Sequence, residues 1–346
     1  MRIAYWTTAC LQPEIEAVSK EVFQLADHFR RSLVFGISPH YVFRTSWMGR
    51  YIGVHPRFDS FLRIAIPLIE RHFDVNHVYG EVTPWTFYKT LRCKPLVLTI
   101  ASEKGIPKVD FLERCQKVFV QTNSFYRRLL DLGIEAEKLE LLYPGVDLKR
   151  FRPQADRLLQ IKRPRILFAS APRSEEEMES RGVYLLLQAA QLNPDVQYHL
   201  LYRAWNRGYT SLAATTKWLD NHALSNVTLT NNIVSDMHSL YPNYDFTVIP
   251  YTQADGGKEC PTSVVEGLAC GLPALISSRA SFAEFVEHHK CGVVFDPTSS
   301  NLVSAIETGM REYRELSANA MSAAHRYFSS ERLLRKMTQL YQSILN

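Results

Sequence analysis

Short apolar runs alternate with amphipathic stretches along almost the whole chain, and this alternation limits the fold more than any other feature. The runs are rich in β-branched and aromatic residues, which is typical of strands, and apolar residues recur at helical spacing between them. Strands separated by helices predict parallel pairing, because a parallel crossover needs a dozen or more residues. The predicted strands span residues 2–7, 32–38, 77–80, 95–101, 117–122, 139–144, 165–170, 196–203, 226–233, 245–252, 273–278 and 292–296. Helices are predicted over 14–31, over 181–192 and, with Asn123 as N-cap and Gly133 as its end, over 123–133.

The alternation is interrupted between residues 145 and 165 by a polar, basic segment with two prolines, as is typical of a linker. We therefore predict the α/β fold class, with two Rossmann-like, doubly wound parallel-sheet domains over residues 1–152 and 164–325 and a linker over 153–163. A final amphipathic helix is expected over 326–346. Ligands bind at the carboxyl ends of the strands in such sheets, so the default site is a central cleft that both domains face.

The composition is that of a soluble globular protein. Of the 346 residues, 46% are hydrophobic and 22% are charged, which excludes extensive disorder. No window approaches the roughly 18–20 apolar residues of a membrane-spanning helix, and the N-terminus lacks the pattern of a signal peptide. The six cysteines include no C-x-x-C pair, so we expect reduced thiols in a cytoplasmic protein and neither a disulfide framework nor a zinc site.

Positive charge is concentrated near the N-terminus. Residues 28–72 hold seven arginines and two acidic residues, a balance of +5, together with eight aromatic residues. Such a stretch fits an anionic membrane surface or another anionic partner. The alternative is an ordinary amphipathic surface, in which the arginines are merely solvated and the aromatic residues Phe35, Phe43, Trp47 and Phe61 belong to the core.

The most informative segment runs from Asp255 to Pro273 and reads DGGKECPTSVVEGLACGLP. A glycine-bearing loop leaves a predicted strand there, and a helix is expected to begin near Thr262 or Ser263. The N–H groups and the dipole at a helix start favour a phosphate. Glu266, expected in the first turn, could accept two hydrogen bonds from a ribose diol. Ser263-x-x-Glu266 also fits a capping box, and spacing alone leaves both interpretations open.

A second feature is Arg181-Gly182, which opens the helix predicted over 181–192 after a loop that starts at Ser170. An arginine at a helix N-terminus is electrostatically unfavourable by a few tenths of a kcal/mol, and a bound diphosphate would reverse that sign. Arg173 in the same loop could join it. The alternative is that neighbouring glutamates neutralise both arginines in a solvated loop, namely Glu175, Glu176, Glu177 and Glu179.

Four motifs occur in order at matching intervals. They are LLYPGVDLKRFRP, then RILFAS followed by RGVYLLLQAAQL, then LYPNYDFTVIP, and finally ECPTSVVEGLACGLPALIS. Together they resemble the interdomain segment, the first strand–helix unit, the helix–strand unit and the C-terminal signature of the family-4 retaining glycosyltransferases, which have the GT-B fold. The resemblance covers about residues 115–345 and is weak before residue 75. It implies an acceptor-side N-terminal domain, a nucleotide-sugar-binding C-terminal domain, and a last helix that crosses back to the N-terminal domain.

The resemblance also implies roles for single residues. Glu266 matches the glutamate that holds the donor ribose, and Arg181 matches a phosphate-binding lysine. The sugar-contacting glutamate would stand eight residues before Glu266, where Lys258 is found, and Glu259 is one residue away. Glu259 and Arg181 are therefore the expected catalytic residues. The implied donor site comprises Arg173, Arg181, Lys258, Glu259, Thr262, Ser263, Val264, Glu266 and, near the base, Ile233. The implied acceptor side comprises Thr8, Tyr79, Glu81, Ser102 and Glu103.

The activity implied by the resemblance is retaining transfer of a hexose from a nucleoside-diphosphate sugar, UDP- and GDP-sugars foremost. The acceptor would be a glycan, a lipid-linked molecule or a small molecule. We expect no cofactor, metal ion or nucleic-acid partner, because a helix dipole and basic side chains stabilise the leaving diphosphate in this fold. The protein is expected in the cytoplasm, with peripheral contact to the inner face of a membrane left open.

The sequence departs from the family pattern at three positions, and these departures leave two other functions open. Ala101 stands where many members have a histidine, Ala171 stands where an arginine is usual, and Lys258 occupies the position of the sugar-contacting glutamate. The chain could therefore be a catalytically impaired protein that binds a sugar nucleotide or glycan. Another GT-B reaction, such as epimerisation, is the remaining alternative.

Overall fold

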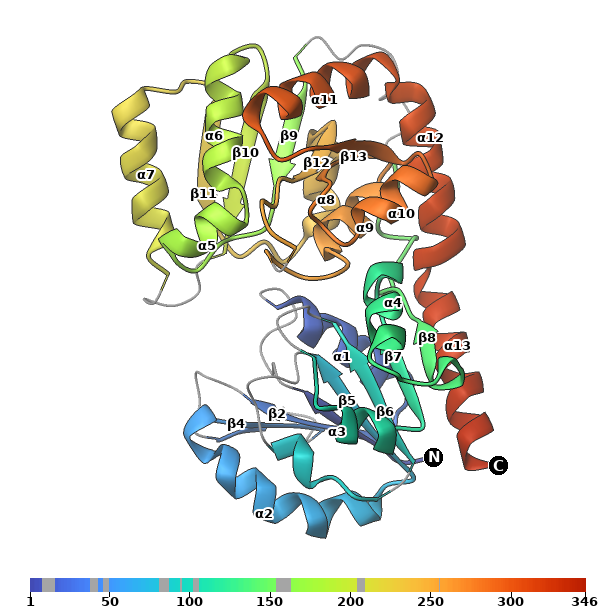
Figure 1. Cartoon of the computed structure of the whole chain (residues 1–346). Helices are drawn as coiled ribbons and strands as arrows, with labels where there is room; N and C mark the ends of the chain where they lie inside the picture. Colours follow the sequence, from blue (N-terminus) through green and yellow to red (C-terminus); the bar gives the residue numbers. More distant parts are fainter. Residues whose placement is uncertain are drawn as a thin grey trace. The chain divides into compact units, whose positions relative to one another are not determined.

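The computed structural model describes residues 1–7, 16–37, 43–45, 50–80, 87–93, 95–101, 106–153, 163–203, 209–254 and 256–346. The chain divides into two compact units, shown in Figure 1. The N-terminal unit comprises Met1–Gly145 and Glu331–Asn346, and the C-terminal unit comprises Val146–Ser330. Most of the predicted linker, residues 154–162, lies outside the described residues.

The N-terminal unit is built on an eight-stranded sheet in the order β3-β4-β2-β1-β5-β6-β7-β8. All neighbours pair in parallel except β3 and β4, which pair antiparallel at one edge. The strands are β1 Ile3–Thr7, β2 Ser32–Ile37, β3 Phe43–Thr45, β4 Tyr51–Val54, β5 Val75–Gly80, β6 Leu96–Ile100, β7 Lys117–Val120 and β8 Leu139–Leu141. The helices are α1 Ala17–His28, α2 Asp59–Ile69, α3 Val109–Arg114, α4 Asn123–Asp131 and α13 Ser330–Leu345.

The C-terminal unit has a six-stranded sheet in the order β11-β10-β9-β12-β13-β14, in which all neighbours pair in parallel. Its strands are β9 Arg165–Phe168, β10 Gln197–Tyr202, β11 Val227–Asn231, β12 Phe246–Ile249, β13 Ala274–Ser277 and β14 Gly292–Phe295. Its helices are α5 Glu175–Ser180, α6 Val183–Leu192, α7 Ser211–His222, α8 Met237–Leu240, α9 Thr262–Ala269, α10 Ala283–His288, α11 Ser299–Arg311 and α12 Tyr313–Ala323. The two sheets, parallel except for the edge strand β3, confirm the predicted α/β fold class.

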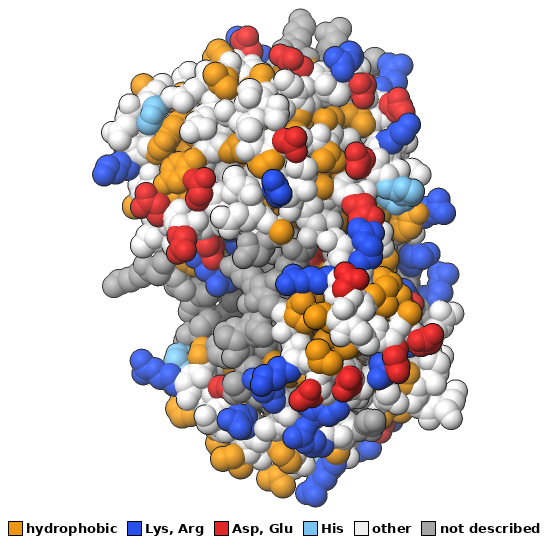
Figure 2. Space-filling model, in the orientation of Figure 1, with side chains coloured by type: hydrophobic (Ala, Val, Ile, Leu, Met, Phe, Trp, Pro, Cys, Tyr) orange, Lys and Arg blue, Asp and Glu red, His pale blue; other side chains and the backbone are white. Residues whose placement is uncertain are grey.

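Surface charge follows the sequence pattern. Figure 2 shows Lys and Arg side chains gathered over the lower part of the view, which the N-terminal unit forms. The aromatic residues of this stretch do not share one environment. Phe35 is buried on β2, whereas Phe61 on α2 is 53% exposed, so the alternative interpretation, which placed both in the core, is wrong for Phe61. The side chains of Phe43 and Trp47 lie outside the described residues.

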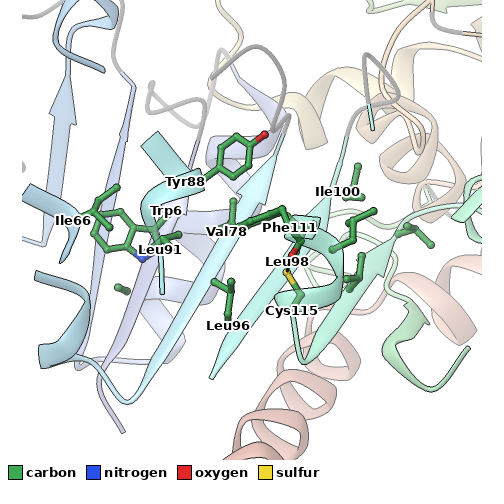
Figure 3. Packing of buried hydrophobic residues seen from close by; sticks show 14 of the residues in the cluster. Trp6, Ile66, Val78, Tyr88, Leu91, Leu96, Leu98, Ile100, Phe111 and Cys115 are labelled. Atoms are coloured by element: carbon green, nitrogen blue, oxygen red, sulfur yellow. Dashed lines mark hydrogen bonds between the residues drawn. The ribbon is translucent and has the colours of Figure 1, made fainter. Parts of the chain in front are cut away.

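Each face of the N-terminal sheet carries its own apolar core. Figure 3 shows one of them, in which Ile66 of α2 lies beside Trp6 of β1, and Tyr88 and Phe111 pack over the neighbouring strands. The core on the other face includes Tyr5 of β1. The last helix, α13, also buries its apolar residues in this second core, namely Leu333, Met337, Leu340 and Tyr341.

A buried polar network ties α13 to the sheet. The Nδ1 atom of His77 lies 2.5 Å from the hydroxyl of Tyr341, and its Nε2 atom lies 2.8 Å from Oγ1 of Thr99. The Tyr341 hydroxyl donates in turn to the hydroxyl of Tyr5, at 3.3 Å. A neutral imidazole that carries its proton on Nδ1 satisfies all of these bonds. Burial favours that neutral form and lowers the pKa of His77 to about 3.

This network predicts that the N-terminal unit loses stability in mild acid. Below pH ~6.5 the unfolded chain binds a proton at His77 that the folded chain refuses, so unfolding is favoured by about 1.4 kcal/mol per pH unit. The loss from this residue should reach about 2 kcal/mol between pH 7.5 and 5 and continue toward pH ~3. Urea unfolding across this range should show a shallower pH dependence in His77→Asn. The same change at exposed His222 should leave the profile unaltered, and equal slopes in all three proteins would refute the assignment.

Two local predictions need correction. The N-cap of α4 is Thr122, whose hydroxyl accepts from the N–H of Phe125 at 3.3 Å, and Asn123 is already the first helical residue. Gly133, at φ +85°, follows the helix end as predicted. Strands β3, Phe43–Thr45, and β4, Tyr51–Val54, were not anticipated, because both are short and β4 contains a glycine, Gly53.

Candidate functional site

The candidate site lies where the winding of the C-terminal sheet reverses. Strands β9 and β12 are neighbours in the sheet, yet the chain leaves β9 toward β10 on one side and leaves β12 toward β13 on the other. Loops at such a switch point diverge and leave room for a ligand at the carboxyl edge. The loop after β9 leads to Arg181, and the loop after β12 leads to α9 and Glu266. Both predicted phosphate-binding segments therefore start from this one point of the sheet.

Arg181 is held between two short helices. It caps the C-terminus of α5, and Gly182 then takes a left-handed conformation, with φ +68°, to start α6. Arg181-Gly182 thus stands directly before a helix, as predicted, but the loop between Ser170 and Arg181 contains α5, which was not predicted. A guanidinium at the end of α5 is favourably placed relative to the dipole of α5, which opposes the unfavourable interaction expected with the start of α6.

The guanidinium of Arg181 is oriented by two side chains. Its Nη1 donates to Oγ of Ser170 at 2.9 Å, and its Nη2 lies 3.5 Å from Oε2 of Glu177. Among the described residues, its Nε is buried without a hydrogen-bond partner. Arg173 is exposed, and its own N–H donates to the same Glu177 oxygen at 2.9 Å. Glu177 therefore forms an ion pair with Arg181, as the alternative interpretation expected, whereas its contact with Arg173 is to the backbone and not to the guanidinium.

Tyr251 connects the two loops of the site. Its hydroxyl lies 3.2 Å from Oγ of Ser170, the atom to which Arg181 donates. A Cβ atom on Gly257 would fall 2.2 Å from that hydroxyl, and one on Gly256 would fall 2.9 Å from Cγ of the ring. Both glycines are therefore needed for the loop to lie against the tyrosine. Sequence reasoning missed Tyr251, although its place at the end of a predicted strand, shortly before the double glycine, was the available signal.

Glu266 is buried and bonded within the unit. The hydroxyl of Tyr241 donates to its Oε2 at 2.9 Å, and both residues are almost fully buried. Burial, reinforced by the Glu266 carboxylate, raises the pKa of Tyr241 well above the usual value for tyrosine, so the phenol stays protonated and remains a donor. Tyr241 precedes β12 and was not anticipated as a partner.

The capping-box interpretation of Ser263 and Glu266 is wrong. Helix α9 begins at Thr262 with Pro261 as its N-cap, and no side chain caps it. Ser263 is thus already helical. Glu266 had been expected in the first turn of the helix, but it lies beyond that turn. The first N–H groups of α9 have no partner within the helix, which is the arrangement that favours an anion.

The remaining donor-site candidates follow the carboxyl ends of strands β11 and β12. Lys258 is half-buried, with its Nζ 3.4 Å from Oγ1 of Thr262, whereas Glu259 is 2% exposed. Val264 is buried on α9. Ile233 is 50% exposed and follows β11, which is the outermost strand of the sheet. The structure thus groups Lys258 and Glu259 with α9, and it shows no contact of Ile233 with them among the described residues.

The acceptor-side candidates belong to the N-terminal unit. Tyr79 is buried at the end of β5, and its hydroxyl donates to Oε2 of Glu21 at 2.6 Å. Its role toward an acceptor stays a prediction. The other four candidates, Thr8, Glu81, Ser102 and Glu103, lie outside the described residues.

Comparisons with known proteins agree with this geometry. Residues 163–311 match the sequence model of the family described as glycosyl transferases group 1. A search among curated proteins finds no significant match. Solved structures do match over nearly the whole chain. A glycosyltransferase from Rickettsia africae has a TM-score of 0.75 and 15% identity, over 100% of this chain and 99% of that one.

Two further structures are equally similar. A sucrose-phosphate synthase from Thermosynechococcus elongatus has a TM-score of 0.76 and 16% identity, over 99% of each chain. HepE from Anabaena, in complex with UDP and glucose, has a TM-score of 0.76 and 17% identity, over 99% of this chain and 100% of that one. This chain has the GT-B fold. The matched family region contains β9, β12 and α9, and with them the switch point of the GT-B C-terminal domain.

The described residues hold neither a membrane-spanning helix nor a metal-binding cluster. No helix there has the length and apolar content needed to cross a bilayer. In the same part of the chain, no group of three or more histidine, cysteine or carboxylate side chains is arranged to hold a metal ion. None of the five described cysteines forms a disulfide: Cys93, Cys115, Cys260, Cys270 and Cys291.

Proposed function

We propose that this protein is a retaining glycosyltransferase that moves a hexose from a nucleoside-diphosphate sugar to a glycan, lipid-linked or small-molecule acceptor. The observation that carries the proposal is the convergence of Arg181, the N-terminus of α9 and the buried Glu266 on one switch point. That point lies within residues 163–311, which match glycosyl transferases group 1. UDP- and GDP-sugars are the foremost donors, and the HepE complex with UDP-glucose supports a UDP-sugar.

In this proposal the two loops divide the donor between them. Arg181 and the N–H groups of Thr262 and Ser263 bind the diphosphate, since a guanidinium and a helix N-terminus both favour an anion. Glu266 binds the ribose hydroxyls, with its carboxylate fixed by Tyr241. Ser170 and Glu177 set the direction of the Arg181 guanidinium, as their distances of 2.9 and 3.5 Å indicate.

The proposed reaction needs no base from the protein. The bond between the anomeric carbon and the diphosphate oxygen breaks, and the acceptor oxygen forms a new bond to that carbon on the same face. The acceptor proton passes to the departing diphosphate oxygen, whose charge Arg181 and the α9 dipole stabilise. Glu259 faces the sugar in this proposal, and Lys258 faces the phosphates.

A catalytically impaired binding protein is the second candidate. The observation that favours it is Ala101, which is fully buried at the end of the β6 segment where the resembled family often has a histidine. Such a protein would bind the same donors through Arg181 and Glu266 without releasing sugar.

Donor hydrolysis separates the two candidates. The chain is incubated with UDP- and GDP-hexoses without acceptor, and the released nucleoside diphosphate and the anomer of the free sugar are measured. A retaining transferase should release the sugar slowly with the anomeric configuration of the donor. Glu259→Gln should lower that release about 10–100-fold while donor affinity changes little. Binding without release would favour the impaired protein, and an inverted anomer would contradict retention.

A further inference from the structure

One helix of the N-terminal unit exposes a row of large apolar side chains. Phe58 is 39% exposed, Phe61 53%, Ile64 73% and Leu68 58%. All four lie on α2 or directly before it, whereas the other exposed large apolar residues of the described chain are scattered over many elements. Spacings of three and four residues place them along one side of a helix. We name this row, Phe58, Phe61, Ile64 and Leu68, the α2 stripe.

The direction of the α2 stripe is fixed by what the helix buries. Leu62 and Ile66 are 4% and 0% exposed and belong to the core against the sheet. Figure 3 shows Ile66 pointing into that core beside Trp6. Because these two residues anchor the inner side of α2, the stripe cannot turn inward without unpacking the core. An exposed contiguous apolar row on a fixed helix marks an interaction surface.

The charges around the stripe are positive. Arg57, Arg63 and Arg71 are all exposed and lie before, within and after it. The acidic residue at its end is not available to balance them. Glu70 is 1% exposed, and its Oε2 accepts from the N–H groups of Arg92 and Cys93, at 2.8 and 2.9 Å. Asp59, half-buried at the helix start, is the remaining acidic side chain of α2.

We propose that α2 lies on the surface of an anionic lipid bilayer, with the stripe in the apolar boundary and the three arginines at the headgroups. The charge complementarity decides the occupant, because basic residues spread along the whole stripe suit an extended anionic plane. Hydrophobic and basic side chains adjoin one another along the lower edge of Figure 2, where Figure 1 places α2. The inference does not depend on the donor site, so either can fail alone.

Flotation of the full chain with vesicles tests the proposal. Vesicles of phosphatidylcholine alone are compared with vesicles that also contain phosphatidylglycerol. The chain should bind the anionic vesicles, and added salt should weaken that binding. Phe61→Ser/Ile64→Ser should weaken it tenfold or more, because it removes two apolar contacts. Arg57→Gln/Arg63→Gln/Arg71→Gln should weaken it by a similar factor and reduce its salt dependence.

Leu192→Ser is the matched control. Leu192 ends α6 in the C-terminal unit and is 60% exposed, so its loss should leave vesicle binding unchanged. Unchanged thermal unfolding of each variant verifies that these surface substitutions preserve the fold. Absence of binding to either vesicle, or equal binding to both, would overturn the proposal. So would a dimer of the chain that Phe61→Ser/Ile64→Ser dissociates, because the stripe would then be covered by a second copy.

Discussion

Replacing Gly182 with alanine is expected to destabilise the C-terminal unit by about 2–4 kcal/mol. Gly182 has φ +68°, and a Cβ atom there would fall 1.7 Å from the carbonyl oxygen of Pro250. The chain would have to move α6 away from the end of β12, the same place where the two site loops meet. The free energy of unfolding in urea measures the loss, and nucleotide affinity should fall with it because Arg181 is the preceding residue.

Gly133→Ala provides the matched control for this prediction. Gly133 also has a positive φ, +85°, but nothing lies within 4 Å of the position of an added Cβ. Its replacement should cost only the backbone strain, about 1 kcal/mol. Equal losses at the two glycines would mean that the close approach to Pro250 has no energetic consequence.

Glu266→Gln is expected to lower the affinity for a nucleoside diphosphate about 10–100-fold. A hydrogen bond to a charged carboxylate contributes about 1.5–3 kcal/mol, and the amide keeps the size of the side chain while it removes the charge. The amide oxygen can still accept from Tyr241, so thermal stability should change less than in Glu266→Ala, which leaves a buried hydroxyl without its acceptor.

Glu287→Gln is the control for this substitution. Glu287 is exposed on α10 of the same unit, and its charge should not affect calorimetric binding of a nucleotide. If Glu266→Gln binds as tightly as the unaltered chain, Glu266 serves the packing of α9 against Tyr241 and not the ribose.

The sequence predicted the sheets well because buried parallel strands read as short apolar runs. It also predicted the site loops, because a strand followed by glycines and by the start of a helix is a pattern that neighbouring residues alone reveal. Strand β4 escaped notice because it has only four residues, one of which is a glycine, Gly53. The exposed side of α2 escaped because the sequence does not say which apolar residues of a helix meet the sheet.

The pattern Ser-x-x-Glu shows where local reasoning ends. Two of its occurrences are Ser174–Glu177 and Ser263–Glu266. At the first, Ser174 caps α5 and accepts from the N–H of Glu177. At the second, the helix starts one residue earlier, at Thr262, and the glutamate turns to Tyr241 instead. The difference comes from Pro261, which can stand before a helix without donating a hydrogen bond, and from a tertiary partner that spacing cannot reveal.

Calorimetric titration of nucleotides tests the central claim most directly. UDP and GDP are titrated into the unaltered chain and into Arg181→Ala, beside UMP and GMP. The proposed site predicts that at least one diphosphate binds more tightly than its monophosphate, and that Arg181→Ala removes most of this preference. Binding of neither diphosphate, or a preference that persists unchanged in Arg181→Ala, would contradict a diphosphate site at the switch point of the C-terminal sheet.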